Sequence, residues 1–549
     1  MSQRRSKRSR SSPLRLEEEQ ASIHFHHQEE RELQRAIQAS LEFDNDESTD
    51  EDTSILEEDI EEEEEEKEES SGAVDTDWSK EATAIVPPPF TSRSGSQTVV
   101  VSPLDLFQLF LPLRFLRTIA ANTTAYAHSK GADSNWQTTA EELYRFIAIH
   151  IAMGINHLPS VHMYWDSRWR CNAVSRIFTR DRYMELLRHF HISSPSSSSS
   201  ATSPLAKVQP LLAEVSSSFS AFYNPDRVLV IDEAIVGYKG RSEMKQYIRN
   251  KPTKWGYKVW CLVSSNYLLA FQVYEGKKGR NSASSPHEAV VSLTHNYQHR
   301  NHILYMDRGF TSPALLLELL HKGIRCCGTV RKNRKDLPSD LLTSSSQLHD
   351  HEYAYRQKGE LGAVVWKDRR LVYMLTTHTS PAEVSSIERK NEDGTTIQQP
   401  VPTTVADYNK HKSGVDTIDQ LHAYYSIGRK SKKWWPRLVW WLIDMCIINA
   451  YSLYQQTQQV QTSQLEFRQQ LMQQLAEQYA SEQSCASSDS STSSHHQTRQ
   501  HWPHHTNKKR DCVFCSHEPE SRQQSRVQCK QCRVHLCVDP CFELYHRQH

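Results

Sequence analysis

Four aspartates are placed where they could hold divalent cations for phosphodiester chemistry. Asp232 and Asp307 each end a four-residue apolar run, and Asp416 and Asp419 are three residues apart in a segment with helical periodicity. Carboxylates at two strand ends and on one face of a neighbouring helix can converge on a pair of hard cations. Such a pair would activate an attacking water or hydroxyl and stabilise the leaving oxygen. Aspartates at strand ends also act as caps and surface residues, so spacing alone leaves both interpretations open.

A second set of metal-ligand side chains lies at the C-terminal end. Six of the 12 cysteines fall between residues 512 and 541, in two Cys-x2-Cys pairs and one Cys-x3-Cys pair, and a His-x2-His pair follows. This spacing suits tetrahedral Zn²⁺ better than free or redox-active thiols. Four pairs predict two Zn²⁺ in a cross-braced finger, with pairs one and three on one ion and pairs two and four on the other. The predicted ligands are Cys512, Cys515, Cys529, Cys532, Cys537, Cys541, His546 and His549, with His517 and His535 as alternatives to the last two.

Two basic segments interleave cations with tryptophan. Cations neutralise phosphates, and aromatic rings stack on bases or wedge between them. The predicted DNA contacts are Lys251, Lys254, Lys258, Arg429, Lys430, Lys432, Lys433 and Trp435. The alternative is a solvated basic face whose tryptophans belong to the core.

The hydrophobic pattern predicts a mixed α/β scaffold for these sites. Strand character is β-branched and aromatic, and helical character shows as apolar residues three and four apart. The predicted strands are 227–236, 258–274 and 302–307, and further short strands fall within 345–405. The predicted helical regions are 102–192, with one helix over 103–119 and a capping box at 138–141, then 314–322 and 408–475.

The charge distribution divides the chain into an acidic tail and a basic body. Residues 1–70 carry 9 Lys or Arg against 24 Asp or Glu, whereas the remaining residues carry 56 against 42. A basic body suits a polyanion partner, although an ordinary basic enzyme with a solubilising tail has the same pattern. No apolar run is long enough to span a bilayer and no N-terminal segment resembles a signal peptide, so we expect a soluble protein without a membrane partner.

The tail contains two short motifs. The basic cluster within 4–10 could be a nuclear localisation signal, which predicts a nuclear protein. Residues 29–42, EERELQRAIQASLE, have one narrow apolar stripe and resemble a ubiquitin-interacting motif. The resemblance implies ubiquitin contacts through Leu33, Ala36, Ile37 and Ser40. The alternative is a marginal helix with no partner.

The order of many short motifs over about residues 102–455 resembles the piggyBac family of transposases. They include VIDEAI at 230–235, KPTKWGYK at 251–258, YMD at 305–307, GVDTIDQ at 414–420 and RKSKKWWP at 429–436. The resemblance implies an α/β fold with an RNase H-like catalytic core, a flanking helical DNA-binding and dimerisation domain, a β-rich insertion and a C-terminal cross-braced zinc finger. The expected boundaries are 1–98 for a disordered acidic tail, 99–225 for the helical part, 226–336 for the first part of the core, 337–405 for the insertion, 406–475 for the end of the core and a helical region, 476–508 for a linker and 509–549 for the finger.

The resemblance also implies a chemistry. Asp232, Asp307 and Asp416 match the family's catalytic positions, and Asp419 matches a further acidic position that the family requires. The expected cofactor there is Mg²⁺ or Mn²⁺, beside two Zn²⁺ in the finger. The enzyme would nick transposon ends, form a hairpin through attack of the freed 3′-hydroxyl, reopen it and join the ends at TTAA. The implied partners are double-stranded DNA and a second copy in a homodimer.

Two departures and two alternatives accompany this interpretation. Arg308 and Gly309 follow Asp307 where the family usually has an amide and an aromatic residue, and Arg249 replaces a common proline. A cation at position 308 could compete for the carboxylates or contact phosphate. One alternative is a non-catalytic, sequence-specific DNA-binding or chromatin protein, and the other is a ubiquitin-linked adaptor built on the tail helix and the finger.

Overall fold

The computed structural model describes most of the chain from residue 77 onward. The described ranges are 77–99, 102–194, 203–249, 251–276, 285–390, 396–457, 462–478, 503–515 and 523–529, with shorter stretches between 532 and 548. The chain divides into two compact units, Met1–Ser481 and Glu482–His549. The predicted ubiquitin-binding helix and the basic cluster of the tail lie outside the described residues. No helix within the described ranges is both long and apolar enough to cross a membrane.

The first part of the larger unit is helical, as the sequence predicts. The helix predicted over 103–119 is two helices, because Pro112 has no N–H to continue the first of them. The Thr139 hydroxyl caps α4 by accepting a hydrogen bond from the Glu142 N–H, one residue later than the predicted capping box. The elements are α2 (Pro103–Phe110), α3 (Leu113–Ser129), α4 (Ala140–Ile155), the 3-10 helix η1 (Val161–Trp165), α5 (Asn172–Ser175), α6 (Arg180–His189) and α7 (Gln209–Ala221).

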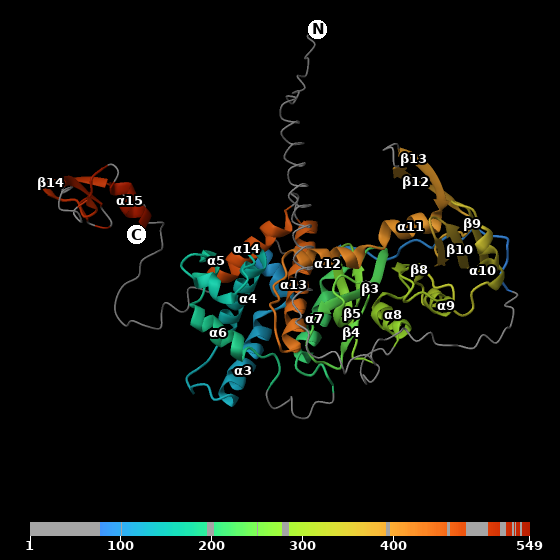
Figure 1. Ribbon diagram of the computed structural model, residues 1–549, viewed down its shortest axis with the longest axis horizontal. Coiled ribbons are helices and arrows are strands. Elements are labelled where there is room, and N and C mark those ends of the chain that lie inside the picture. Colours follow the sequence, from blue (N-terminus) through green and yellow to red (C-terminus); the bar gives the residue numbers. More distant parts are fainter. Residues whose placement is uncertain are drawn as a thin grey trace, which may run out of the picture. The chain divides into compact units, whose positions relative to one another are not determined.

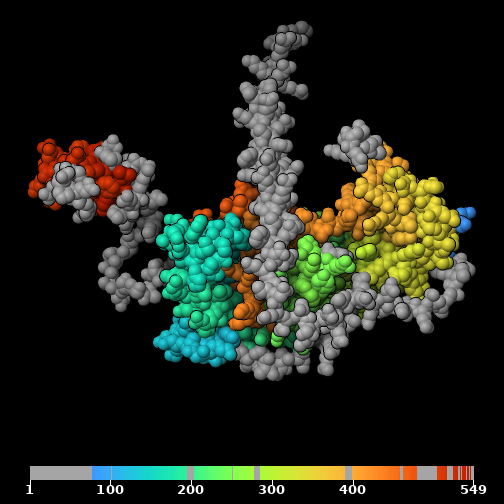
Figure 2. Space-filling view, viewed as in Figure 1, coloured from blue at the N-terminus to red at the C-terminus, as the bar shows by residue number. Residues whose placement is uncertain are grey.

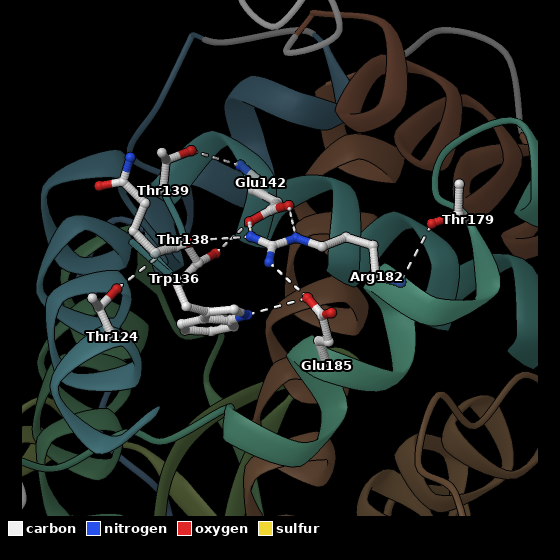
Figure 3. Close-up of polar contacts among 9 residues, drawn as sticks. Thr124, Trp136, Thr138, Thr139, Glu142, Thr179, Arg182 and Glu185 are labelled. Carbon is white, nitrogen blue, oxygen red and sulfur yellow. Dashed lines mark hydrogen bonds and ion pairs between the residues drawn. The ribbon is translucent and has the colours of Figure 1, made fainter. Parts of the chain in front are cut away.

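A partly buried ionic network joins α6 to the start of α4 (Figure 3). The Arg182 guanidinium donates to both carboxylate oxygens of Glu142 at 2.7 Å and to Glu185 at 3.1 Å. The Trp136 indole also donates to Glu185, and the Thr138 hydroxyl donates to Glu142. Glu142 is almost fully buried, and these donors replace the hydration that its carboxylate loses there.

The centre of the larger unit is a nine-stranded mixed sheet. In spatial order its strands are β4 (Lys245–Tyr247), β5 (Trp255–Ser264), β3 (Val228–Gly237), β7 (Ile303–Met306), β8 (Arg325–Thr329), β11 (Leu371–Thr376), β10 (Leu361–Lys367) and β9 (Tyr353–Lys358), and β6 (Tyr267–Val273) also pairs with β5. Strands β3, β7 and β8 run parallel, and the other neighbours are antiparallel. The strand predicted at 258–274 is a hairpin, turning at Ser265 and Asn266, which both have positive φ as a tight two-residue turn requires.

The strands of the predicted insertion extend the core sheet. Strand β11 pairs with β8 of the core, so β9 to β11 continue the sheet and form one surface with it (Figure 2). A separate hairpin of β12 (Val384–Lys390) and β13 (Thr396–Pro402) follows. The short helices of this region are α10 (Ser339–Ser344) and the 3-10 helix η4 (Ser345–Gln347). The β-rich character expected of 337–405 is therefore present, but most of its strands belong to the core sheet.

Helices pack against the sheet, and the last two, α13 and α14, contact the helices of the first part of this unit (Figure 1). The Asn449 side chain ties α13 to β6 by accepting from the Leu268 N–H at 2.8 Å and donating to its carbonyl at 2.9 Å. The remaining helices are α8 (Pro286–Thr294), the 3-10 helix η3 (His295–Tyr297), α9 (Pro313–His321), α11 (Thr403–His411), α12 (Gly414–Tyr424), α13 (Trp435–Thr457) and α14 (Gln464–Gln478).

The segment 77–99 pairs with strands of the larger unit, so the predicted boundary of the tail at residue 98 is too late. Ser79 exchanges backbone hydrogen bonds with Gln357 of the edge strand β9. Further along, β1 (Gly95–Ser96) pairs with β2 (Tyr223–Asn224). The boundary was misplaced because the prediction relied on apolar periodicity, whereas an extended backbone can pair with a strand without it.

The smaller unit contains the cysteine-rich end. Its described elements are β14 (Pro503–Asp511), β15 (Gln524–Cys529) and α15 (Cys541–Gln548), and β14 pairs antiparallel with β15. Strand β14 begins inside the linker predicted over 476–508. Cys512, Leu536 and Cys541 are buried together at the centre of this unit.

Candidate active site

The two strand aspartates lie side by side in the sheet. Parallel strands β3 and β7 are in register up to Ile231 opposite Met306, so the next residue on each strand is an aspartate. Asp307 follows the end of β7, whereas Asp232 is inside β3 and not at its end as predicted. The negative charge of Asp307 contributes to the raised pKa of Asp232, as expected for neighbouring carboxylates.

Helix α12, which carries the other two aspartates, packs against β3 and β5 (Figure 1). A β-carbon at Gly414 would lie 3.2 Å from the side chain of Val230, so glycine permits the helix to lie this close to β3. Asp416 is in the first turn of α12, where the helix dipole stabilises a carboxylate, and Asp419 follows it by three residues. Cys261 pairs with Asp232 across β3 and β5, and its thiol pKa is raised by burial and then by Asp419 and Asp232.

A lysine from the loop between β4 and β5 lies among these carboxylates. The Lys251 ammonium is 3.5 Å from an oxygen of Asp232 and donates to the Glu233 carbonyl at 2.9 Å. Burial lowers the pKa of Lys251, but Asp232, Glu233, Asp419 and Asp416 more than offset this and raise it. The sequence predicted Lys251 as a DNA contact, and its position adds a role in balancing the charge of the carboxylates.

Two of the aspartates are costly to ionise in the absence of a bound cation. Burial raises the pKa of Asp232 to about 7, against the opposing effect of Lys251, and Glu233 adds to the increase. Burial also raises the pKa of Asp419 to about 6, although His422 and Lys251 act in the opposite direction. Lys251 therefore does not neutralise the site fully, and a further positive charge would be stabilised there.

The carboxylate oxygens of this site suit a hard divalent cation, although they do not surround a single point. Carboxylate oxygens are the ligands that Mg²⁺ and Mn²⁺ prefer, and Asp232, Asp307, Asp416 and Asp419 supply them. Within the described ranges, the aspartates do not form a group of three ligands with donor atoms within 4.8 Å of one another. Arg308 is exposed beside Asp307, and the Asp307 turn is held by the Gly309 N–H, which donates to its carboxylate at 2.8 Å.

A polar cluster that the sequence did not predict connects the elements bearing the aspartates. Tyr305, two residues before Asp307, donates a hydrogen bond to Asp407 of α11, the helix that precedes α12. His378, which follows β11, approaches the same carboxylate at 3.2 Å, and His411 at 3.4 Å. Burial alone would raise the pKa of Asp407, but the hydrogen bonds from His378 and Tyr305 lower it. The only sequence signal was the Asp407–His411 spacing of one helical turn.

The predicted DNA contacts fall into two groups. Lys254, Lys430, Lys432 and Lys433 are exposed. Lys258 lies 3.9 Å from Glu233, and the Arg429 guanidinium is 5.4 Å from the centre of the Tyr164 ring. Trp435 is only 6% exposed and packs edge-on against His191, which favours the alternative of a core tryptophan.

Four cysteines of the smaller unit form a candidate metal centre. One ligand atom from each of Cys512, Cys515, Cys537 and Cys541 lies within 4.8 Å of the others. Sulfurs around tetrahedral Zn²⁺ are about 3.8 Å apart, so the cluster could hold a metal ion. These are the first and third cysteine pairs, the grouping that the cross-braced pattern predicts. The second set, Cys529, Cys532, His546 and His549, stays a prediction because His549 and the side chain of His546 lie outside the described residues.

The raised pKa values predict a pH-dependent stabilisation by divalent cations. Between about pH 4 and pH 7 the folded chain keeps protons on Asp232 and Asp419 that the unfolded chain releases, so the stability of the metal-free protein falls as pH rises through this window. A cation that binds the ionised carboxylates should therefore raise the melting temperature more at about pH 7.5 than at about pH 5.5. Thermal unfolding with and without Mn²⁺ measures this. An equal increase at both pH values, or the same pH dependence in Asp232→Asn, would contradict the assignment.

Comparisons with known proteins agree with the sequence motifs. A family model described as Transposase IS4 matches residues 102–451. The chain is similar to the human PiggyBac transposable element-derived protein 5, with 26% identity over 394 residues, 67% of this chain and 74% of the relative. It is also similar to the human PiggyBac transposable element-derived protein 3, with 27% identity over 385 residues, 68% of this chain and 64% of the relative.

A solved structure shares the fold. It is a piggyBac transposase in a synaptic complex with hairpin DNA, determined by cryo-electron microscopy. The TM-score is 0.65 at 23% sequence identity, and the match covers 81% of this chain and 98% of the other. The chain therefore shares its mixed α/β fold with that transposase.

Proposed function

Because the chain belongs to the piggyBac-type transposase family, we propose that it is a metal-dependent DNA transposase, or a recent descendant that keeps the chemistry. The observation that carries the proposal is the gathering of four aspartates from β3, β7 and α12 in a site where burial raises two of their pKa values. Such a site favours divalent cations and phosphate-transfer chemistry.

The strand order supports an RNase H-like assignment for the core. Strands β6, β5 and β3 are antiparallel neighbours, and β7 and β8 continue the sheet parallel to β3. Asp232 lies on β3, Asp307 directly follows β7, and Asp416 and Asp419 lie on α12, which packs against β3 and β5. The helical part, α2 to α7, would then bind DNA and support a homodimer.

We assign the proposed roles of the residues from their positions in the site. Asp232, Asp307 and Asp416, with Asp419, would hold Mg²⁺ or Mn²⁺. The bound cations would supply activation of the attacking oxygen and stabilisation of the leaving oxygen. Lys251 would move from Asp232 toward a DNA phosphate once a cation occupies the carboxylates, since both positions offer it negative charge.

The DNA substrate is the remaining part of this proposal. The solved neighbour is a complex with hairpin DNA, which supports transposon-end DNA as partner and a hairpin intermediate here. Exposed Lys254, Lys430, Lys432 and Lys433 would contact phosphates. Joining at TTAA and a nuclear location belong to the same proposal, because the reaction requires chromosomal DNA.

An excision assay in cells tests this function. A reporter would be flanked by the inverted repeats that neighbour the gene, and the full chain would be expressed beside it. The expected result is excision that restores a single TTAA in the donor DNA. Absence of excision, with folded protein that still binds the repeats, would overturn the catalytic proposal.

The non-catalytic DNA-binding protein remains the second candidate. The observation that favours it is the Lys251 ammonium on Asp232, because a lysine can replace the charge of a cation in a site that has lost its chemistry. A ubiquitin-linked adaptor would depend on residues 29–42, outside the described part of the chain.

We also propose that the smaller unit binds two Zn²⁺ that supply its folding energy, since its apolar core is small. Cys541→Ser is expected to remove at least one of the two Zn²⁺ per chain and to destabilise this unit, because three thiolates hold the ion far more weakly. Elemental analysis of the purified full chain measures the zinc content. Cys171→Ser, at a half-buried cysteine of the larger unit, should leave it unchanged. Full zinc retention in Cys541→Ser would contradict this proposal.

A further inference from the structure

An aromatic pair stands exposed on the hairpin of β4 and β5. Tyr247 and Trp255 are direct partners across the two strands, and their ring centres are 4.8 Å apart. Tyr247 is 39% exposed and Trp255 is 41% exposed. Such a pair stabilises a hairpin modestly, but that role does not require the rings to face solvent.

One cation contacts this pair, and others lie near it in the sequence. The Lys245 ammonium lies 4.7 Å from the centre of the Trp255 ring, in cation–π geometry. Arg241, Arg249 and Lys254 of the same segment are exposed. Exposed aromatic rings flanked by cations are the combination that binds unpaired nucleic acid, since every base offers a flat face and every nucleotide a phosphate.

The same hairpin reaches the carboxylates. Lys251 belongs to the loop between β4 and β5, and its ammonium contacts Asp232 and the Glu233 carbonyl. The aromatic pair closes the base of this loop, because Tyr247 and Trp255 are the last paired residues before it. A DNA strand that runs from the carboxylates along this hairpin would therefore reach the two rings.

We propose that Tyr247 and Trp255 form a stacking platform for an unpaired nucleobase of the DNA strand held at the carboxylate site. The inference rests on the proposed function and extends it, because cleavage beside a duplex end leaves bases that have lost their partners. A protein partner would also bury exposed aromatic rings, but these cations and the adjoining carboxylate site favour DNA.

Fluorescence anisotropy with two labelled probes tests the platform. One probe is a blunt duplex of about 30 base pairs, and the other is the same duplex with a single-stranded tail of about four thymidines. The full chain is titrated without divalent cations, so that cleavage does not intervene. Trp255→Ala and Tyr247→Ala are compared with Trp255→Phe and Tyr247→Phe, which keep an aromatic face. Trp169→Ala is the matched control, because Trp169 is 58% exposed elsewhere on the surface.

We expect each alanine variant to weaken binding of the tailed probe by about five- to a hundredfold and binding of the blunt probe by less than about twofold. The phenylalanine variants should recover most of the loss, and Trp169→Ala should bind both probes as the wild type does. Equal losses on both probes, or no loss on the tailed probe, would overturn the platform. If the alanine variants bind the tailed probe normally while the wild type still excises its reporter, the platform fails and the proposed function stands. If the wild type binds neither probe, both fail.

Discussion

Asp232→Asn is expected to reduce metal-dependent DNA cleavage by at least about a thousandfold, while the chain stays folded and bound to DNA. Asparagine has nearly the same shape but carries no charge, so it removes a cation ligand without opening a cavity. Metal-assisted charge stabilisation contributes several kcal/mol to such a transition state, and each tenfold in rate corresponds to about 1.4 kcal/mol. Binding should persist, because the exposed lysines that would contact phosphates are unchanged.

Cleavage of an end-labelled duplex by the purified full chain, with Mg²⁺ or Mn²⁺, measures this effect. Asp307→Asn should cause a similar loss, because Asp307 follows β7 directly beside Asp232 of β3 and its charge acts on the Asp232 carboxyl. Asp105→Asn makes the same chemical change at an exposed position on α2 and is expected to leave the rate unchanged. Cleavage by Asp232→Asn within about tenfold of the wild-type rate would exclude Asp232 as a metal ligand.

The chemistry-bearing residues could be predicted from the sequence more readily than their arrangement. Apolar runs before Asp232 and Asp307 indicate strands because such runs must be buried. The runs do not reveal that β3 and β7 are parallel neighbours in a register that pairs the two aspartates. Register depends on contacts between segments far apart in the chain, which a local pattern does not contain. The close approach of α12 to β3 likewise depends on Gly414, whose role appears only when Val230 lies beside it.

Some residues have positions that depend on tertiary contacts and could not be predicted from residue type. Trp435 follows a run of cations and was predicted to contact DNA, yet the apolar helix that it begins buries it. Lys251 belongs to a basic segment, but its position beside Asp232 could not be read from charge patterning. The segment 77–99 lacks a periodic apolar pattern, so its pairing with β9 and β2 was not predictable from composition.

A fully buried ion pair holds the helix that carries Asp416 and Asp419. His422, near the C-terminal end of α12, contacts one oxygen of Asp444 in α13 at 2.6 Å. Arg468 of α14 donates to the other oxygen of Asp444 at 2.7 Å and to the Tyr425 carbonyl just beyond α12 at 3.2 Å. Burial alone would raise the pKa of Asp444, but Arg468 and His422 lower it, so the carboxylate is charged in the folded chain. The contact positions three helices against one another around a single charge.

Arg468→Met is therefore expected to destabilise the larger unit by about 3–5 kcal/mol, since it leaves the Asp444 charge buried with His422 as its remaining side-chain contact at the carboxylate. Chemical denaturation monitored by helical circular dichroism measures the change. Arg114→Met is the matched control, because Arg114 pairs with Glu214 while 78% exposed and should cost less than about 1 kcal/mol. Combining Arg468→Met with Asp444→Asn should recover part of the loss by removing the buried charge.

The same pair predicts a pH dependence. Because the folded pKa of Asp444 is lowered, the extra stability of the wild type over Arg468→Met should be present above the pKa of an unfolded aspartate, about 3.9. It should be lost as pH falls through the folded value. A loss in Arg468→Met no larger than in Arg114→Met would show that the pair does not hold α12, and the anchoring of Asp416 and Asp419 would then rest on the packing of α12 against β3, β5 and α13.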